Sequence, residues 1–495
     1  MSFAASCDWT LIRSLMLAVA AGPLCWTCER GLRASTRPTL WLALIVLPFL
    51  FPELLLSYLI ASFVVGRPWR AELACDAILL LRCVPVGVLT LWISPPSSLS
   101  SAALHLAWLR CRGWRGLGAW LRCYWFGPVR RMLPAVGLMF LVNFQEFEAA
   151  AILGAVSWTD RLFTQHAYGL TLAASTPFLF RPLVIQVVVL AFVGWSLLRR
   201  DAERGWDHEV ELVSPRLVRA AEVFAGAWCF VGVVLPLLLL SRELVMGWTW
   251  LVRQPQAVAH LFAEIGSAGL VGLVAGLLAW NAARWMLPSG DREAPDCGDV
   301  SAMDATFRGL TPPARKSMTS ESLGLALVCL PGLCGALTVG LAVLQVSTWS
   351  ALRPLSSTPV WWVLASTIWL LPRAMLLQLW WLRSTEPAAL HLVHLLRESP
   401  HIAQRQQAWR RWWAWRVEPQ IAAVGVLCYW AYLDLTSAGL LAPPGMASVV
   451  VRLYNFMHNG HSAALSMEAT VAMCVPVIAW GTVLLTARLG RWGGR

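Results

Sequence analysis

Three acidic residues stand inside long apolar runs of the sequence, where a charged side chain is costly. Glu146 and Glu148 interrupt the apolar run 132–154, and Asp434 interrupts the run 420–441. A charge at the centre of a membrane-spanning helix costs about 2.5–3.5 kcal/mol or more, so such residues are default candidates for a functional site. We therefore predict that these three carboxylates line a translocation pathway. The alternative is that they reach the membrane surface or bond to a neighbouring helix.

The other residue types that could do chemistry form weaker patterns. His458 and His461 have HxxH spacing, and one helical turn would place both rings on one face, but no acidic residue lies nearby in the sequence. Cys25 and Cys28 form a CxxC pair without the second pair that a zinc site needs. The only lysine, Lys316, is not preceded by the glycines of a phosphate-binding loop. No metal site, no cofactor and no enzymatic activity is predicted.

Membrane-spanning helices are the elements that must position the three acidic residues. Of the 495 residues, 58% are hydrophobic and only 13% are charged, whereas a soluble domain has about 25% charged residues. The formal net charge is +12, but the basic residues lie between apolar runs rather than together on one polar segment. This pattern is typical of membrane proteins and argues against a nucleic-acid partner. The predicted fold class is an all-α polytopic membrane protein.

Eleven apolar runs have roughly the 20 residues that a helix needs to cross a bilayer core of about 30 Å. They are 10–27, 40–64, 75–94, 132–154, 180–198, 219–240, 264–281, 321–346, 358–382, 420–441 and 464–486. If the C-terminus is cytoplasmic, the inside segments contain 28 basic residues and the outside loops contain 7. Because cytoplasmic loops are enriched in basic residues, we predict a multi-pass protein of the cell (inner) membrane with a cytoplasmic C-terminus.

Four segments of the first half of the sequence are echoed in the second half, in the same order. The pairs are LALIVLP at 42–48 with LALVCLP at 325–331, AALHLAWLR at 102–110 with AALHLVHLLR at 388–397, AVGLMFLVNFQEFEAAAIL at 135–153 with AVGVLCYWAYLDLTSAGLL at 423–441, and RLFTQHAYG at 161–169 with RLYNFMHNG at 452–460. The offsets rise only from 283 to 291. Four matches in order indicate an internal duplication rather than chance similarity between apolar helices.

The duplication predicts the domain organisation. Residues 1–198 form a first repeat, 199–218 a cytoplasmic linker, and 219–495 a second repeat with one extra leading span. The plan that the two repeats share is two spans, a long arginine-rich loop and two further spans. Both long loops lie inside by the charge distribution, so the repeats are parallel, which is a natural frame for a central pathway.

Three segments resemble a known family. The run LLAPPGMASVVVRLYNFMHNGHSAALS at 440–466 resembles the Pro-Pro-Gly and Leu-Tyr-Asn-x-Met-His segment of certain permeases, and FQEFEAAAILG at 144–154 is similar to their Glu-Phe-containing fifth span. The loops 96–131 and 383–419 stand where these permeases have the EAA loop. The chain thus resembles the fused two-repeat permease subunits of binding-protein-dependent ABC importers of the iron(III), thiamine and spermidine type.

The resemblance implies a type I ABC importer permease fold and several partners. Separate ATP-binding subunits would dock on the cytoplasmic loops, and an external substrate-binding protein would deliver an iron(III)-like ion, a thiamine-like vitamin or a polyamine. Membrane lipid is the remaining expected partner. The residues expected in the coupling loops are Ala102, Ala103, His105, Ala388, Ala389 and His391.

The loops also depart from the family pattern. The glycine of the EAA loop is replaced by Ala107 in the first repeat and by Val393 in the second. These departures favour a second hypothesis, in which the chain is a non-transporting membrane scaffold or sensor on the same fold. A third hypothesis is a polytopic membrane enzyme, such as a lipid-linked glycosyl or acyl transferase, for which Glu146, Glu148 and His166 are the nearest candidates.

Overall fold

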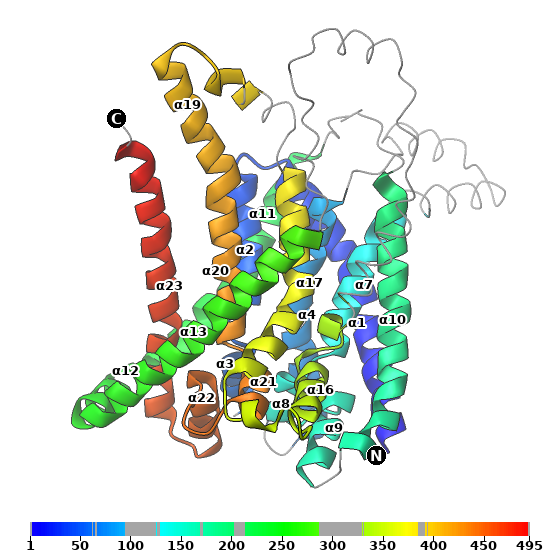
Figure 1. Ribbon diagram of the computed structural model, residues 1–495. Helices are drawn as coiled ribbons and strands as arrows, with labels where there is room; N and C mark the ends of the chain where they lie inside the picture. Colours follow the sequence, from blue (N-terminus) through cyan, green and yellow to red (C-terminus); the bar gives the residue numbers. More distant parts are fainter. Residues whose placement is uncertain are drawn as a thin grey trace, which may run out of the picture.

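The structure of the 495-residue chain is a computed structural model in which every regular element of the described residues is a helix (Figure 1). The described residues are 2–61, 63–64, 67–94, 125, 129–168, 172–201, 213–286, 329, 331–384, 392–393 and 395–493. Within them, six helices are long and apolar enough to cross a membrane, or eight if each of two sharply bent pairs forms one span. The prediction of an all-α, multi-pass membrane protein is confirmed, whereas the number of eleven spans stays a prediction.

The helices fall into two sets that we call the first half and the second half. The first half comprises α1 (Phe3–Arg33), α2 (Pro38–Leu50), α3 (Glu53–Ala61), α4 (Pro68–Ile93), α7 (Arg130–Phe144), α8 (Glu148–Leu153), α9 (Trp158–Ala167) and α10 (Leu172–Asp201). The second half comprises α11 (Pro215–Cys229), η2 (Phe230–Val234), α12 (Leu235–Arg253), α13 (Pro255–Met286), α16 (Ala336–Ser347), η3 (Arg353–Leu355), α17 (Val360–Ser384), α19 (Ile402–Trp412), η4 (Trp413–Val417), α20 (Glu418–Tyr432), α21 (Leu435–Leu441), α22 (Val449–His458) and α23 (Ser462–Gly493). The N- and C-termini lie at opposite ends of the bundle (Figure 1).

Helices in the two halves have matching lengths and packing partners. Helices α7 and α20 each contain 15 residues and begin 288 positions apart, and α9 and α22 each contain 10 residues and begin 291 positions apart. The last two begin after Ser157 and Ser448, whose side chains accept a hydrogen bond from a backbone N–H of the first turn, a common way to start a helix. Helix α1 packs on α4 and α7, as α13 packs on α17 and α20.

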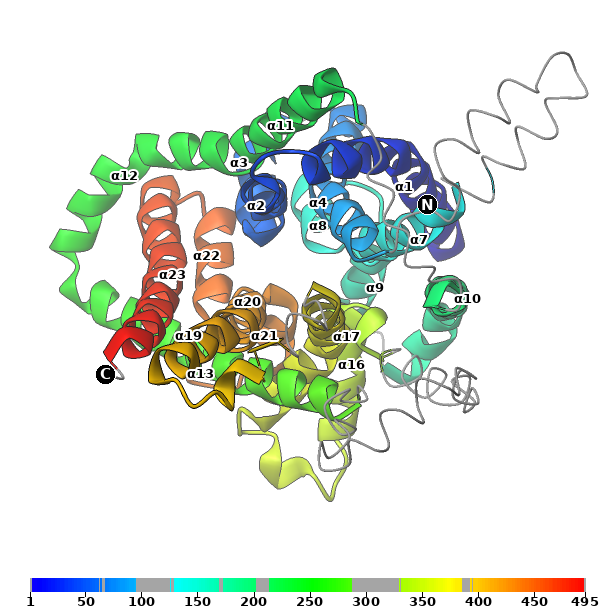
Figure 2. The ribbon, with the colours of Figure 1, turned by 90° about the horizontal axis from the view of Figure 1, so that it is seen from above.

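A helix of 39 residues, formed by α11, η2 and α12, joins the two halves. Its first part packs on α1 and α2, and its last part packs on α23. Figure 2 shows it following the edge of the molecule between these two groups. At Gly247 an added Cβ would lie 2.3 Å from the carbonyl oxygen of Ala463, so only glycine allows this close approach of α12 to α23.

This long helix corrects one expectation from hydropathy. The apolar run 219–240 and the run 264–281 predicted an outside loop over 242–265. Instead, α12 continues to Arg253 and α13 begins at Pro255, which leaves a single residue between them. Polar residues such as Arg242 and Glu243 continue the helix beyond the apolar run, because helix formation does not require an apolar sequence.

Exposed surfaces of the outer helices are apolar, as expected for contact with lipid. Only 11% of the most apolar part of α23 is buried within the protein. Its residues Val477, Ile478 and Leu485 are each more than half exposed. In water such a surface would promote association, whereas in a bilayer it is the normal lipid-facing side of a helix.

Charged residues inside the first half form a buried clamp between three helices. The Glu29 side chain on α1 has no exposed surface, forms an ion pair with Arg33, and accepts a hydrogen bond of 2.9 Å from Arg131 on α7. Both arginines also donate to the carbonyl of Leu91, and Arg33 donates to that of Trp92, near the end of α4. One carboxylate therefore connects α1, α4 and α7 through two guanidinium groups.

Candidate functional site

Two bent pairs of helices turn toward the centre of the molecule. Helices α2 and α3 meet at an angle of 69°, and Pro52 lies at the break, where its lack of an N–H prevents a regular helical hydrogen bond. Helix α20 and helix α21 meet at 53°, and Asp434 occupies that break. Its Oδ1 accepts hydrogen bonds from the backbone N–H groups of Thr436 and Ser437 and so starts α21.

Two further interruptions lie at the same place. Helix α7 ends at Phe144 and α8 begins at Glu148, so Glu146 lies in the short connection between them. Helix α16 begins after Gly335, whose φ of 92° belongs to the left-handed region that favours glycine. Two contacts join the halves here: the side chain of Gln145 donates to the carbonyl of Leu333, and the rings of Phe49 and Trp430 lie 5.5 Å apart.

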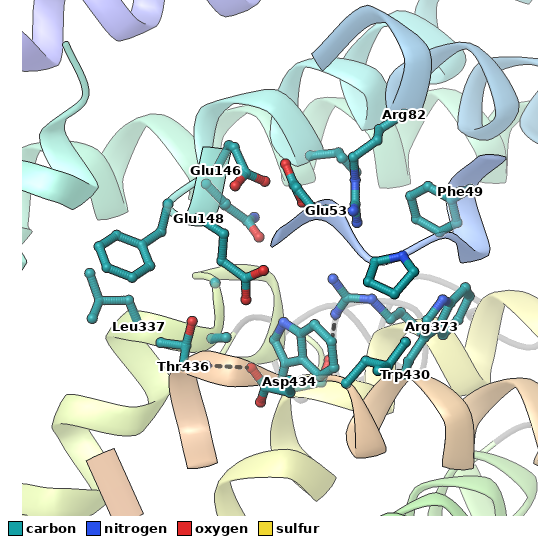
Figure 3. A pocket seen from close by; sticks show the side chains of 18 of the residues that line it. Phe49, Glu53, Arg82, Glu146, Glu148, Leu337, Arg373, Trp430, Asp434 and Thr436 are labelled. Carbon is teal, nitrogen blue, oxygen red and sulfur yellow. Dashed lines mark hydrogen bonds and ion pairs between the residues drawn. The ribbon is translucent and has the colours of Figure 1, made fainter. Parts of the chain in front are cut away.

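The four interruptions surround one cavity between the halves, with a volume of about 130 Å³ (Figure 3). This is close to the ~150 Å³ of an engineered cavity that binds benzene, so in this conformation it suits a small solute. Six charged side chains line the cavity, four from the first half and two from the second. They are Glu53, Arg82, Glu146, Glu148, Arg373 and Asp434.

The first-half arginine of the cavity is held by a carboxylate and a ring. The Arg82 guanidinium on α4 forms an ion pair of 2.7 Å with Glu53, and lies 5.2 Å from the centre of the Phe49 ring. Glu53 is only 7% exposed, and its carboxyl group lies within interaction distance of the Glu146 carboxyl. Two carboxylates so close together repel each other unless a positive charge or a shared proton lies between them.

The second-half arginine has a similar environment. The Arg373 guanidinium on α17 lies 3.9 Å from the Trp369 ring centre, and donates a hydrogen bond to the carbonyl of that residue. It interacts electrostatically with Asp434 and with Arg82 of the other half. Asp434 is 4% exposed, and its Oδ2 accepts no hydrogen bond from any described residue. The cavity thus contains an acceptor atom without a donor.

The cavity contains more acidic than basic side chains. Glu146 accepts a hydrogen bond of 3.0 Å from the backbone N–H of Ala149, and Glu148 lies within electrostatic reach of Glu146, Asp434 and Arg82. Four carboxyl groups face two guanidinium groups, so the lining has two surplus negative charges when every group is ionised. In a partly desolvated space, this surplus attracts positively charged solutes more strongly than it would in water.

The three acidic residues predicted from the sequence therefore meet in one place. Glu146 and Glu148 come from the first half and Asp434 from the second, and all three line the cavity (Figure 3). Their role in translocation stays a prediction. His166, the nearest candidate for an enzymatic base, lies on α9 and is not part of the lining.

The six residues predicted for the coupling loops are not placed by the structure. Ala102, Ala103, His105, Ala388, Ala389 and His391 lie outside the described residues. Their docking role stays a prediction.

The HxxH pair does not lie on one helical turn. Helix α22 ends at His458, and Gly460, with a φ of 73°, turns the chain before His461. The two rings therefore do not share a helical face. Across the part of the chain that the structure describes, no group of three or more His, Cys, Asp or Glu residues could hold a metal ion. Cys25 and Cys28 are buried free thiols.

Sequence reasoning missed the role of Glu53 and of the aromatic residues in the lining. Glu53 directly follows Pro52 within the apolar run 40–64, and a proline beside a charge in such a run is a recognisable sign of a broken membrane helix. Phe49 and Trp369 carried no comparable signal, because the chain has 30 Trp and 17 Phe residues. Only the fold identifies which rings reach the cavity.

The fold and this site define a polytopic helical membrane protein whose two halves meet at a small, acidic cavity. Comparison of the chain with protein-family models, with curated proteins and with solved structures gives no match.

Proposed function

We propose that the chain is the membrane-spanning part of a solute transporter and that the cavity is its translocation site. The observation that carries this proposal is the convergence of interrupted helices from both halves on one buried, charged cavity. Irregular backbone at membrane depth is tolerated where it is enclosed by protein or lines a water-filled space, and broken helices form the solute sites of many transporters. Transport would proceed by a rocking of one half against the other.

More narrowly, we propose the permease subunit of an ABC-type importer in the cell (inner) membrane. The resemblance of 144–154 and 440–466 to such permeases supports this, as do the matched helix lengths and packing partners of the two halves. The proposed organisation has eleven spans, two parallel repeats at 1–198 and 219–495, and a cytoplasmic C-terminus. The solute would be an iron(III)-like ion, a thiamine-like vitamin or a polyamine.

In this proposal the chain itself performs no covalent chemistry. Separate ATP-binding subunits press on the cytoplasmic loops 96–131 and 383–419, and an external substrate-binding protein delivers the solute. The absence of a phosphate-binding loop in the sequence supports the need for a separate ATPase. The rocking motion then couples ATP hydrolysis at the loops to access at the cavity.

Co-purification tests the proposal. We expect the chain to co-elute in a fixed stoichiometry with one of a set of tagged candidate ATPases, and Ala102→Arg or Ala388→Arg to reduce the bound ATPase at least about tenfold. A bulky charge in a docking helix leaves buried groups of the partner unpaired, which costs several kcal/mol. Ser350→Arg, at an exposed position in a loop predicted outside, is the matched control and is expected to leave co-elution unchanged.

An intact, monodisperse chain that binds none of the ATPases would contradict the importer. That result would favour the scaffold or sensor hypothesis, which the altered EAA loops already support. Equal loss of co-elution in Ser350→Arg and in the loop variants would also contradict the proposed docking sites.

A further inference from the structure

Both arginines of the cavity occupy positions that suit a bound organic cation. Each guanidinium lies over an aromatic ring, Arg82 over Phe49 at 5.2 Å and Arg373 over Trp369 at 3.9 Å. Each is also attracted by a buried carboxylate, Glu53 for the first and Asp434 for the second. A ring face beside a carboxylate is the combination by which proteins bind ammonium and guanidinium ligands.

The two guanidinium groups come from opposite halves and repel each other. Arg82 lies on α4 and Arg373 on α17, which are equivalent helices, and each lies within electrostatic range of the other (Figure 3). Like charges in a partly desolvated cavity are costly unless nearby acids offset them. Their presence together therefore depends on the acidic lining, and either one could leave if another cation took its place.

The lining has binding capacity that the arginines do not use. Glu146 and Glu148 form no salt bridge within the described part of the chain. The buried Oδ2 of Asp434 and the buried Oε1 of Glu53 accept no hydrogen bond there. These are acceptor atoms that an amine or guanidine donor of a small solute could reach.

We propose that Arg82 and Arg373 act as tethered occupants of two cation subsites, and that the transported solute is a small organic cation whose amine or guanidine groups replace them. This inference rests on the proposed transport function, because it assigns the solute class of the same cavity. Exchange of one cation for another leaves the net charge of the lining unchanged. Solute entry therefore does not leave the buried carboxylates of Glu53 and Asp434 without a counter-charge, which would be strongly unfavourable.

A titration of the purified full-length chain in detergent with agmatine, which has one amine and one guanidine group, tests this inference. The substitution Arg373→Ala removes one of the two tethered cations. We expect it to lower the Kd for agmatine about tenfold, because the vacated subsite becomes available to free ligand. Arg82→Ala is expected to act in the same direction. The matched control is Arg70→Ala: this guanidinium also lies over a ring, Trp69, but outside the cavity, and its loss should leave the Kd unchanged.

Weaker or unchanged agmatine binding in both variants would overturn the inference, because the arginines would then be structural or direct ligands. Tighter binding of succinate than of agmatine by the wild-type chain, abolished by Arg373→Ala, would assign an anionic solute instead. Tighter binding of Co²⁺ than of agmatine would assign a metal ion. If Arg373→Ala does not fold by size-exclusion chromatography, Arg373→Gln, which retains a polar side chain without the positive charge, provides the same comparison.

The titration separates this inference from the proposed function. It contains no ATPase and no binding protein, so tighter agmatine binding without any ATPase partner would retain the cation site and reject the importer. Co-elution with an ATPase without any gain in agmatine affinity would reject the cation subsites and retain the importer.

Discussion

Asp434→Asn is expected to weaken agmatine binding to the purified chain about 10- to 100-fold while leaving the fold intact. Asparagine starts a helix as well as aspartate does, so the hydrogen bonds from Thr436 and Ser437 that begin α21 are retained. The substitution removes only the buried negative charge. A hydrogen bond to a charged group contributes about 1.5–3 kcal/mol, which corresponds to the stated loss of affinity.

Isothermal titration of wild-type and variant chains measures this effect. Asp160→Asn, on α9 and outside the cavity lining, is the control and is expected to retain wild-type affinity. An unchanged affinity in Asp434→Asn would remove this carboxylate from the site. An equal loss in both variants would show that the effect is a general one of net charge rather than of the cavity.

Glu29→Ala is expected to reduce the free energy of unfolding by about 3–5 kcal/mol, the usual cost of removing one partner of a buried ion pair. Glu29 is fully buried, and its removal takes one ion-pair partner from Arg131, a residue that is only 7% exposed. The connection between α1, α4 and α7 is weakened at the same time. Unfolding of the detergent-purified chain, followed by circular dichroism, measures the loss.

Arg488→Ala provides the comparison for this second prediction. Its ion pair with Glu418 spans 3.2 Å, but the arginine side chain is 60% exposed, so the expected loss is below about 1 kcal/mol. Similar losses in Glu29→Ala and Arg488→Ala would contradict the role assigned to the buried clamp.

The membrane class and the acidic residues of the cavity could be predicted from the sequence because both follow from the cost of polar groups in lipid. A bilayer accepts few spanning structures, so long apolar runs predict membrane helices, although the runs 40–64, 132–154 and 420–441 are each interrupted in the structure. The same cost makes Glu146, Glu148 and Asp434 conspicuous within such runs. Their convergence on one cavity required the fold, because it depends on how the two halves pack.

The expectations that did not hold concern local helix ends. Hydropathy measures the thickness of the apolar region and not the length of the helix. The apolar run 219–240 therefore covers only part of a helix that continues to Arg253. The HxxH pair was separated by the turn at Gly460, which a spacing rule does not consider. Glu53 carried a local sign, the adjacent Pro52 within an apolar run, but its pairing with Arg82 could not be read from the sequence because the two residues are 29 positions apart.

The proposed transport mechanism requires two parallel halves that place equivalent breaks around one cavity. Reporter fusions after residues 110 and 400, each in a full-length membrane-inserted chain, test this arrangement directly. We expect both reporters to be active on the cytoplasmic side. Reporters on opposite faces of the membrane would contradict the parallel arrangement and, with it, the assignment of the cavity as a shared translocation site.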